Sequence, residues 1–326
     1  MKILLVTNML PHKSNLYYGI FVKEQMDALQ KYHQVDYDTY FIEGYTSKVN
    51  YMRSIWQIRD MINRNNYDLI HIHYGLSGLF LLFNPKPSIP VLLTLHGGDI
   101  QKEQKKYMQV YLSKHIIRKS DFVVTLNKSM DTIVKRYNPR TQIVPCSVDT
   151  EFFCNTETKT KLNKENQISI IFPSDRNRSV KNYPLFEKTI EILRLQYHIK
   201  EIELVGLSRD DVKRYMQTSD LLLLTSFSEG SPQVVKEALS CNLPVVSTPV
   251  GDVELLLNGV CNCLVSKTFS PEELAKDVSL ALSGQIKGIT GREKIKELQL
   301  DEQTTAKKIY SIYSNLVSEH SLKYRK

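Results

Sequence analysis

The sequence lacks an apolar run long enough to cross a membrane. Its most apolar stretch, Leu76 to Phe83, falls far short of the ~20 residues that a membrane-spanning helix needs. The start of the chain also lacks the form of a secretory signal, because only a short apolar run precedes Asn8 and Pro11. We therefore interpret residues 1 to 8 as a first strand and expect a cytoplasmic protein without a membrane span.

The chain also has few cysteines and no segment of biased composition. The chain has 5 cysteines, an odd number that does not suit a disulfide framework, and Cys261-x-Cys263 has no companion pair to complete a zinc site. No internal repeat or low-complexity tract is present, and the apolar fraction of 42% and charged fraction of 24% are ordinary for a folded protein. We expect buried thiols in a reducing compartment.

Acidic residues are under-represented in the first half of the chain. Residues 1 to 150 hold 19 Lys and Arg against 12 Asp and Glu, a net charge of +7, whereas residues 151 to 326 hold 24 against 23, a net charge of +1. A basic half indicates an anionic partner: a membrane surface, a phosphorylated acceptor or nucleic acid. Since the sequence contains no nucleic-acid-binding motif, we do not expect nucleic acid.

Apolar, β-branched runs alternate with amphipathic stretches along the whole chain, a pattern typical of parallel sheets covered by helices. The predicted strands are Ile3–Thr7, Val35–Ile42, Leu69–Ile72, Val91–Leu95, Phe122–Thr125, Ile168–Phe172, Ile202–Val205, Leu221–Leu224, Pro244–Ser247 and Val260–Val265. The predicted helices cover residues 19–31, 50–65, 101–119, 128–137, 183–197, 209–218, 232–240 and 271–283. At 326 residues, two Rossmann-like doubly wound α/β domains are the simplest organisation.

The domain boundaries follow from a polar segment without apolar periodicity. We predict an N-terminal acceptor-binding domain over residues 1–154, a linker over 155–166, and a C-terminal donor-binding domain over 167–300. Residues 301–326 are predicted as a helix that could pack back on the N-terminal domain. Ligands of open parallel sheets bind beyond the carboxyl ends of the strands, so the loops that follow the strands are the place to look for a site.

One of these loops carries the strongest motif of the chain. After a predicted strand come Glu229, Gly230 and Pro232, and the helix that follows contains Glu237. The N–H groups and the dipole at a helix start suit a phosphate, and Pro232 in the first turn lacks a donor that would be spare in any case. The two carboxylates could accept hydrogen bonds from a sugar and from a ribose, so the motif predicts a site for a nucleotide sugar.

The segment Glu229-Gly-Ser-Pro-Gln-Val-Val-Lys-Glu237-Ala-Leu, with Leu243-Pro-Val-Val-Ser-Thr-Pro-Val-Gly251 downstream, resembles the E-x7-E signature of retaining glycosyltransferases of family 4. The resemblance implies the GT-B architecture, two Rossmann-like domains facing a central cleft that closes over the substrates. It also implies transfer of a hexosyl group with retention from a nucleoside diphosphate sugar, with UDP favoured over GDP and without a cofactor or metal.

The resemblance extends to other loops and implies roles for their residues. In Ser174–Lys181, Arg178 and Lys181 would meet the donor diphosphate, although Arg176 has the five-residue spacing to the lysine that other members show. His96, in the segment Thr94-Leu-His-Gly-Gly-Asp99, would bind a hydroxyl of the donor sugar. These residues and Glu229 form the expected catalytic set.

The resemblance also implies a donor-binding set. Glu237 would hold the ribose, and Gly19 would approach the phosphates from the N-terminal domain. The remaining candidates lie on the same class of loop or at the helix start: Gly206, Ser226, Gly230, Ser231 and Gln233.

Some positions depart from the family pattern or allow a second interpretation. Cys146-Ser-Val-Asp149 stands where many relatives have N-G-V-D, and Gly251-Asp252-Val-Glu254 replaces G-G-x-P-E, so the base and the sugar of the donor stay open. The spacing His71-x-His73 could suggest a metal pair, but the family has an H-x-H strand end here that needs no metal, and we favour that interpretation.

The acceptor is not encoded in a motif. We expect a glycan, a lipid-linked or another anionic acceptor, in bacterial cell-surface polysaccharide biosynthesis. Residues 101–119 form a basic amphipathic pattern that could dock on the inner face of an anionic membrane, or could equally be a core-facing helix with a solvated basic face. Two alternatives remain open: a sugar-nucleotide epimerase of the same fold, and a non-catalytic protein that binds anionic surfaces or nucleic acid.

Overall fold

The computed structural model describes residues 1–13, 17–100, 107–155 and 167–324 of the chain. They form two compact units, Met1–Cys146 with Gln303–Lys326, and Ser147–Glu302. The first unit therefore ends eight residues earlier than the predicted boundary after residue 154, and helix α12 (Glu302–Tyr324) belongs almost entirely to it. Most of the predicted linker, residues 156–166, lies outside the described residues.

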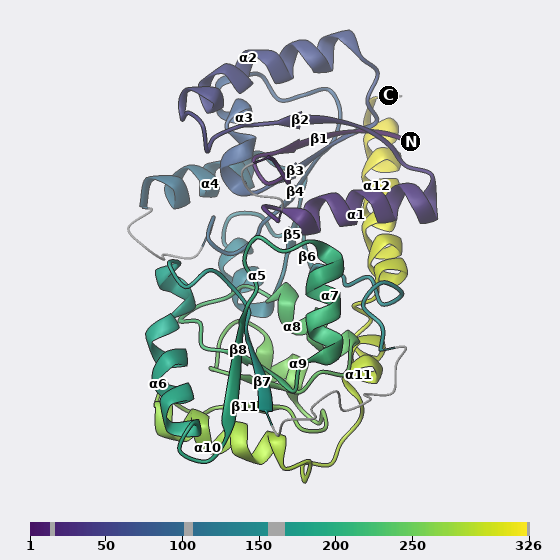
Figure 1. Cartoon of the computed structure of the whole chain (residues 1–326). Helices are drawn as coiled ribbons and strands as arrows, with labels where there is room; N and C mark the ends of the chain where they lie inside the picture. The colour runs from purple at the N-terminus through teal and green to yellow at the C-terminus, as the bar shows by residue number, and fades with distance from the viewer. Residues whose placement is uncertain (14–16, 101–106, 156–166, 325–326) are drawn as a thin grey trace. The chain divides into compact units, whose positions relative to one another are not determined.

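The first unit is built on a six-stranded parallel sheet in the order β2-β1-β3-β4-β5-β6 (Figure 1). The strands are β1 (Lys2–Thr7), β2 (Asp36–Phe41), β3 (Leu69–His73), β4 (Val91–Thr94), β5 (Phe122–Thr125) and β6 (Thr141–Ile143). The chain adds β2 on one side of β1 and β3 on the other. The connections diverge there, so the ligand crevice of this fold is expected beyond the carboxyl ends of β1 and β3.

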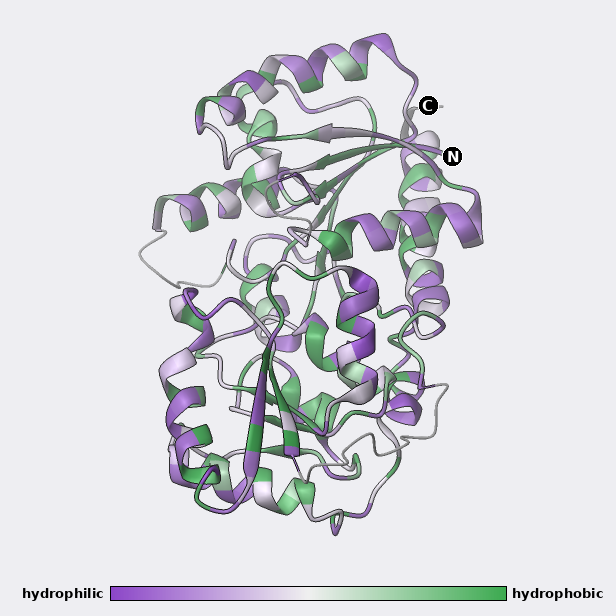
Figure 2. Ribbon diagram, viewed as in Figure 1, coloured by the Kyte–Doolittle hydropathy of each residue, from purple (hydrophilic) through white to green (hydrophobic). Residues whose placement is uncertain are grey.

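Helices cover both faces of this sheet. They are α1 (Ile20–His33), α2 (Val49–Arg64), α3 (Phe80–Phe83), α4 (Tyr107–Lys119) and α5 (Lys128–Val134), with a short 3₁₀ helix, η1, at Gly75–Gly78. Along β1, Ile3 and Leu5 pack with α1 and α12, whereas Leu4 and Val6 pack on the opposite face with α2 to α5. Figure 2 shows the buried strand β1 in green and the edge strand β2 in purple.

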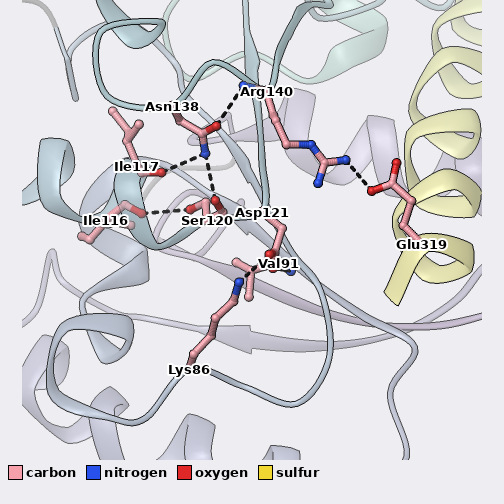
Figure 3. A network of polar contacts seen from close by, with 9 residues as sticks. All are labelled: Lys86, Val91, Ile116, Ile117, Ser120, Asp121, Asn138, Arg140 and Glu319. Carbon is pink, nitrogen blue, oxygen red and sulfur yellow. Dashed lines mark hydrogen bonds and ion pairs between the residues drawn. The ribbon is translucent and has the colours of Figure 1, made fainter. Parts of the chain in front are cut away.

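A polar network ties the chain together near the amino ends of β4 and β5 (Figure 3). The Asn138 side-chain amide donates to the carbonyls of Ile117 (3.1 Å) and Ser120 (2.8 Å), so it closes the end of α4. The Arg140 guanidinium donates to Glu319 Oε2 on α12 at 2.6 Å. Helix α12 is thus fixed to its unit by an ion pair as well as by apolar packing.

The second unit is built on a five-stranded parallel sheet in the order β11-β10-β9-β7-β8. Its strands are β7 (Gln167–Phe172), β8 (His198–Glu203), β9 (Leu221–Leu224), β10 (Val245–Ser247) and β11 (Leu264–Val265). Its helices are η2 (Ser179–Lys181), α6 (Tyr183–Leu193), α7 (Arg209–Thr218), α8 (Gln233–Ser240), α9 (Val253–Leu257), α10 (Pro271–Leu282) and α11 (Gly291–Glu297). Here the connections diverge between β7 and β9, which pair directly.

The two predicted Rossmann-like sheets are confirmed, but several elements were misplaced or missed. Strand β8 begins at His198 instead of Ile202, since it is an edge strand in which polar residues flank both isoleucines, and apolar runs do not reveal such strands. The apolar run at 76–83 forms η1 and α3, and β6, α9 and α11 are too short to give a clear period. None of the described helices combines the length and apolarity needed to cross a membrane.

Candidate functional site

In the second unit, the loops after β7 and β9 meet at the point where the connections diverge. The Phe227 N–H donates to the Val180 carbonyl at 2.9 Å, and the Thr225 hydroxyl donates to the Lys181 carbonyl at 3.1 Å. These bonds hold the two loops together through their backbones. The side chains that project from the two loops therefore share one site.

Lys181 and Glu229 form the centre of this site. Lys181 Nζ lies 2.6 Å from Glu229 Oε1, and the two side chains are only 12% and 16% exposed. The Ser226 hydroxyl donates to the same oxygen at 2.7 Å. Lys181 and Glu229 had been assigned separately to the diphosphate and to the sugar, yet here they are partners. The structure records no protein partner for Glu229 Oε2 within the described residues, so that oxygen is available to a ligand.

Helix α8 follows this turn and begins at Gln233, so Pro232 is its capping residue and not, as predicted, part of its first turn. No side chain caps the helix. The Val235 N–H bonds to the Pro232 carbonyl at 3.2 Å, but no partner within the described residues is recorded for the N–H groups of Gln233 and Val234, which remain for an anion at the positive end of the dipole. Gly251 (φ 58°) packs under the turn, where a Cβ would lie 2.7 Å from the Gly230 carbonyl oxygen, so no side chain fits there.

Glu237 lies one turn into α8 and is almost fully buried. Its Oε1 accepts from the Arg209 guanidinium at 2.9 Å, and that guanidinium lies 4.7 Å from the centroid of the Phe153 ring. Arg209, at the start of α7, was not predicted. Its sequence neighbourhood shows only a helix start after Gly206, and only the fold brings it to Glu237.

Two other predicted donor-binding residues bond to positions that depart from the family pattern. The Gln233 amide donates to the Ser147 carbonyl at 2.6 Å, and its Oε1 is buried without a partner in the described part of the chain. The Ser231 hydroxyl donates to Asp252 Oδ2 at 2.6 Å. Burial raises the pKa of Asp252, while the nearby Lys236 ammonium, itself fully buried, lowers it.

The two candidate arginines differ in their surroundings. Arg176 donates through Nε (2.8 Å) and a terminal nitrogen (2.6 Å) to Glu203 and lies over the Tyr183 ring. Arg178 is exposed, and its guanidinium has no recorded ion pair with any described residue. The structure therefore favours Arg178 as the arginine that is free to meet a ligand. Gly206, with φ 67° and open space at the Cβ position, is also accessible.

In the first unit, His96 follows β4 and lies beside the end of β3. His96 Nε2 is 3.1 Å from His73 Nδ1, and Phe21 packs against the ring at 4.8 Å. Either tautomer leaves one N–H of the pair without a partner. The two remaining nitrogens, His73 Nε2 and His96 Nδ1, are both buried, and neither has a partner in the described part of the chain.

Burial makes this histidine cluster neutral. It lowers the pKa of His96 to about 3 and that of His71 to about 3, and it holds the pKa of His73 well below its usual value. Both His71 nitrogens have partners, Tyr313 Oη on α12 (2.6 Å) and Thr94 Oγ1 (2.8 Å). This occupancy leaves His71 without a nitrogen for a metal, in agreement with the interpretation of the H-x-H segment as structural.

Asp99 and Gly19 shape the loops of the first unit. The Asp99 carboxylate is fully buried and accepts from the backbone N–H groups of Gly75 (3.0 Å) and His96 (3.1 Å), while burial raises its pKa to about 6. It therefore fixes the His96 loop to the end of β3. Gly19 (φ 66°) begins α1, and a Cβ there would overlap the Met9 backbone at 2.2 Å, so this contact alone requires glycine.

Family models match both units. Residues 18–152 match the model for glycosyltransferase family 4, and residues 181–283 match the model for glycosyl transferases group 1. The second match spans Lys181, Glu229 and Glu237. The chain is a family 4-like glycosyltransferase of the GT-B fold.

Curated relatives and solved structures agree with this assignment. The chain is 24% identical over 277 residues to an uncharacterized glycosyltransferase of Methanocaldococcus jannaschii, and the match covers 76% of this chain and 79% of that protein. It is 27% identical over 252 residues to the glycosyltransferase TuaC of Bacillus subtilis, which its name assigns to teichuronic acid biosynthesis, covering 68% of this chain and 63% of TuaC.

Among solved structures, sucrose-phosphate synthase from Thermosynechococcus elongatus gives a TM-score of 0.80 at 15% identity and covers 98% of this glycosyltransferase and 99% of that chain. HepE from Anabaena, in complex with UDP-glucose, gives a TM-score of 0.70 at 16% identity and covers 97% and 100%. At such identities the likeness shows the fold.

Proposed function

We propose that the enzyme transfers a hexosyl group, with retention, from a nucleoside diphosphate sugar that binds to the second unit. The observation that carries this proposal is the Lys181–Glu229 pair beside the uncapped start of α8. A cation, a helix N-terminus and a carboxylate with one available oxygen are the groups needed for a diphosphate joined to a sugar. UDP is the favoured nucleotide, since HepE, which shares the fold, was solved with UDP-glucose.

In this proposal the second unit stabilises the leaving group. Donor binding moves the Lys181 ammonium from Glu229 to the diphosphate, and Arg178 adds a second cation. Together with the N–H groups of α8 they stabilise the negative charge that grows as the diphosphate departs. Glu229 then binds a sugar hydroxyl, and Glu237, oriented by Arg209, binds the ribose. No metal is needed for this electrostatic work.

His96 is the residue of the first unit that we propose to bind a sugar hydroxyl. As a neutral ring, His96 binds a hydroxyl without adding charge to the site. The acceptor is proposed to be a glycan or a lipid-linked anionic molecule of a cell-surface polysaccharide pathway. The relation to TuaC and the positive charge of residues 1–150 support this part of the proposal.

A thermal-shift panel of nucleoside diphosphates and their sugars, with a chelator present, tests the donor assignment. A ligand at 100 times its dissociation constant stabilises the fold by about 2.7 kcal/mol, which is easily detected. We expect UDP and one UDP-sugar to raise the melting temperature without metal. Stabilisation by no nucleotide would contradict the proposal. Product analysis of the donor alone then separates transfer, which needs an acceptor, from epimerisation, which does not.

A further inference from the structure

Helix α2 in the first unit presents an apolar stripe to solvent. Val49, Met52 and Trp56 are 55%, 45% and 64% exposed, and their spacing of three and four residues places them on one side of the helix. The opposite side packs on the sheet through Ile55 and Ile58. Figure 2 shows the resulting mixture of green and purple along α2. Trp56 is the single tryptophan of the chain, and burial in the core does not explain it.

A second element extends the stripe. The Asn84 amide donates to the Ile55 carbonyl of α2 at 2.8 Å, so the end of α3 is fixed beside this helix. Phe83, the last residue of α3, is 61% exposed. Exposed side chains of this size scattered singly are normal, but four that share two adjacent helices form a surface that indicates a binding partner.

Cations border this stripe. Arg53 and Arg59 are exposed on α2, and the structure records no ion pair for either with the residues it describes. Between α2 and residues 84–88 lies a groove of about 240 Å³ that Arg59 and Lys86 line. Asp121 holds Lys86 in place (Figure 3). Apolar side chains with a rim of positive charge match the interface of an anionic lipid bilayer.

We propose that the α2 surface, defined by Val49, Met52, Trp56 and Phe83 with Arg53 and Arg59, docks the enzyme on an anionic lipid bilayer. Tryptophan suits the boundary between headgroups and acyl chains because its ring is apolar and its N–H is polar. The arginines bind lipid phosphates, and the groove beside Arg59 accepts a headgroup. The inference rests on the proposed function in one respect, because a lipid-linked acceptor requires the site to work at a membrane.

The position of α2 agrees with this role. Val49 and Met52 lie at the start of α2, which follows the carboxyl end of β2. That edge of the sheet also carries His73 and the His96 loop. A bilayer against the first turns of α2 therefore lies at the edge where the site of this unit opens.

Helix α4, which the sequence suggested for docking, also exposes Tyr107, Met108 and Tyr111, so the two helices are distinguished by the surroundings of their cations. Within the described part of α4, Lys114 and Arg118 lie over the Tyr137 ring, at 5.4 and 4.8 Å, so these cations contact the protein. Lys102, Lys105 and Lys106 lie outside the described residues. Exposed Met108 on α4 therefore offers a matched control for Met52.

Trp56 is a built-in reporter for the test. We expect its fluorescence emission to shift to shorter wavelength when the protein is mixed with vesicles of phosphatidylglycerol and phosphatidylcholine, and not with phosphatidylcholine alone. The absence of a shift with the anionic vesicles would overturn the proposal. Neither result depends on donor binding, which the nucleotide panel measures separately, so a failure here and a failure of the proposed function can be told apart.

Variants locate the surface. Replacing Arg53 and Arg59 together with Ser should weaken vesicle binding roughly 25-fold, since each basic residue near an anionic surface contributes about 1 kcal/mol. Met52→Ser should also weaken it, whereas Met108→Ser on α4 and Leu195→Ser in the second unit should leave it unchanged. Equal losses in Met52→Ser and Met108→Ser, or no loss in the double arginine variant, would overturn the assignment to α2.

Discussion

The two units carry side chains of different charge at equivalent places in similar sheets: paired ions in the second unit and neutral histidines in the first. In the second unit, the loops at the point of divergence carry charges held in pairs, Lys181 with Glu229 and Arg209 with Glu237. In the first unit, the corresponding edge holds three buried histidines that are neutral at pH 7. The comparison shows that one architecture can present paired charges on one sheet and uncharged hydrogen-bonding rings on the other.

The partners of these side chains explain the difference. The Lys181–Glu229 pair of the second unit is partly exposed, so a charged ligand can replace one partner without leaving a bare ion in the protein. The histidines of the first unit are enclosed by Thr94, Tyr313 and one another, and burial opposes the addition of a proton to any of them. Exchange of partners is therefore expected in the second unit and a fixed geometry in the first.

The largest effect is expected from Lys181→Ala. Loss of the cation that meets the diphosphate should lower kcat roughly 100-fold to 1000-fold, as removal of one transition-state contact does elsewhere. Steady-state kinetics with the true donor measure this. Lys188→Ala, an exposed lysine on α6, is the matched control and should keep wild-type turnover. Equal rates for Lys181→Ala and the wild type would remove Lys181 from the mechanism.

The histidines predict how the stability of the first unit depends on pH. Their pKa values are lower in the folded state than in the unfolded chain, so the unfolded chain binds more protons and stability falls as pH drops below about 6.5. Asp99 has the opposite effect. Its pKa is raised to about 6 in the folded state, so below that pH the folded protein binds a proton at Asp99 that the unfolded chain releases. Since three histidines oppose one aspartate, the net effect is a loss of stability as the pH falls from 6 to 4, on the order of 1 kcal/mol per pH unit for each net proton.

Urea unfolding at several pH values, followed by circular dichroism, measures this dependence. His73→Asn, whose amide nitrogen can replace Nδ1 as a donor, should make the dependence shallower by one proton. A stability that stays constant between pH 6 and 4 would contradict the neutral histidine cluster.

A smaller effect is expected from Glu237→Ala. Removing the carboxylate deletes the proposed ribose contact and the ion pair with Arg209, so donor binding should weaken by roughly 30-fold while kcat changes little. Calorimetric titration with the donor measures the affinity, and Glu254→Ala, an exposed glutamate on α9, is the control. A loss confined to kcat would contradict a ribose role.

The smallest effect distinguishes the two arginines. Arg178→Ala should weaken diphosphate binding by about 10-fold, the value of one exposed charge-assisted hydrogen bond. Arg176→Ala should change it less than Arg178→Ala, because Glu203 already binds the Arg176 guanidinium. A larger loss of affinity for Arg176→Ala than for Arg178→Ala, measured by the same titration, would assign the diphosphate contact to Arg176.

Much of the fold could be predicted from the sequence, because buried parallel strands such as Leu221–Leu224 are continuous apolar runs. Edge strand β8 and the three-residue strand β6 could not be predicted in this way, since neither is a continuous apolar run. Likewise, the motif around Glu229 and Glu237 marked the helix start by its glycine and proline, and its position one residue later in the structure lies within the usual uncertainty of helix ends.

The side-chain contacts within the site could not be predicted from the sequence. Arg209 is 28 residues from Glu237, and His73 is 23 residues from His96. No local pattern connects such pairs, because the strand order alone brings them together. The exposed stripe of α2 was missed for a related reason. Its apolar residues look like a core face until the structure shows which side of the helix packs on the sheet.

The affinity of UDP for Glu229→Gln tests most directly the claim that Lys181 exchanges Glu229 for the diphosphate. In the wild type, UDP must take Lys181 from a carboxylate 2.6 Å away. The amide of glutamine holds the ammonium less strongly and does not repel the phosphates. Calorimetry should therefore show that the variant binds UDP several-fold more tightly than the wild type. Equal or weaker binding of UDP would contradict the exchange.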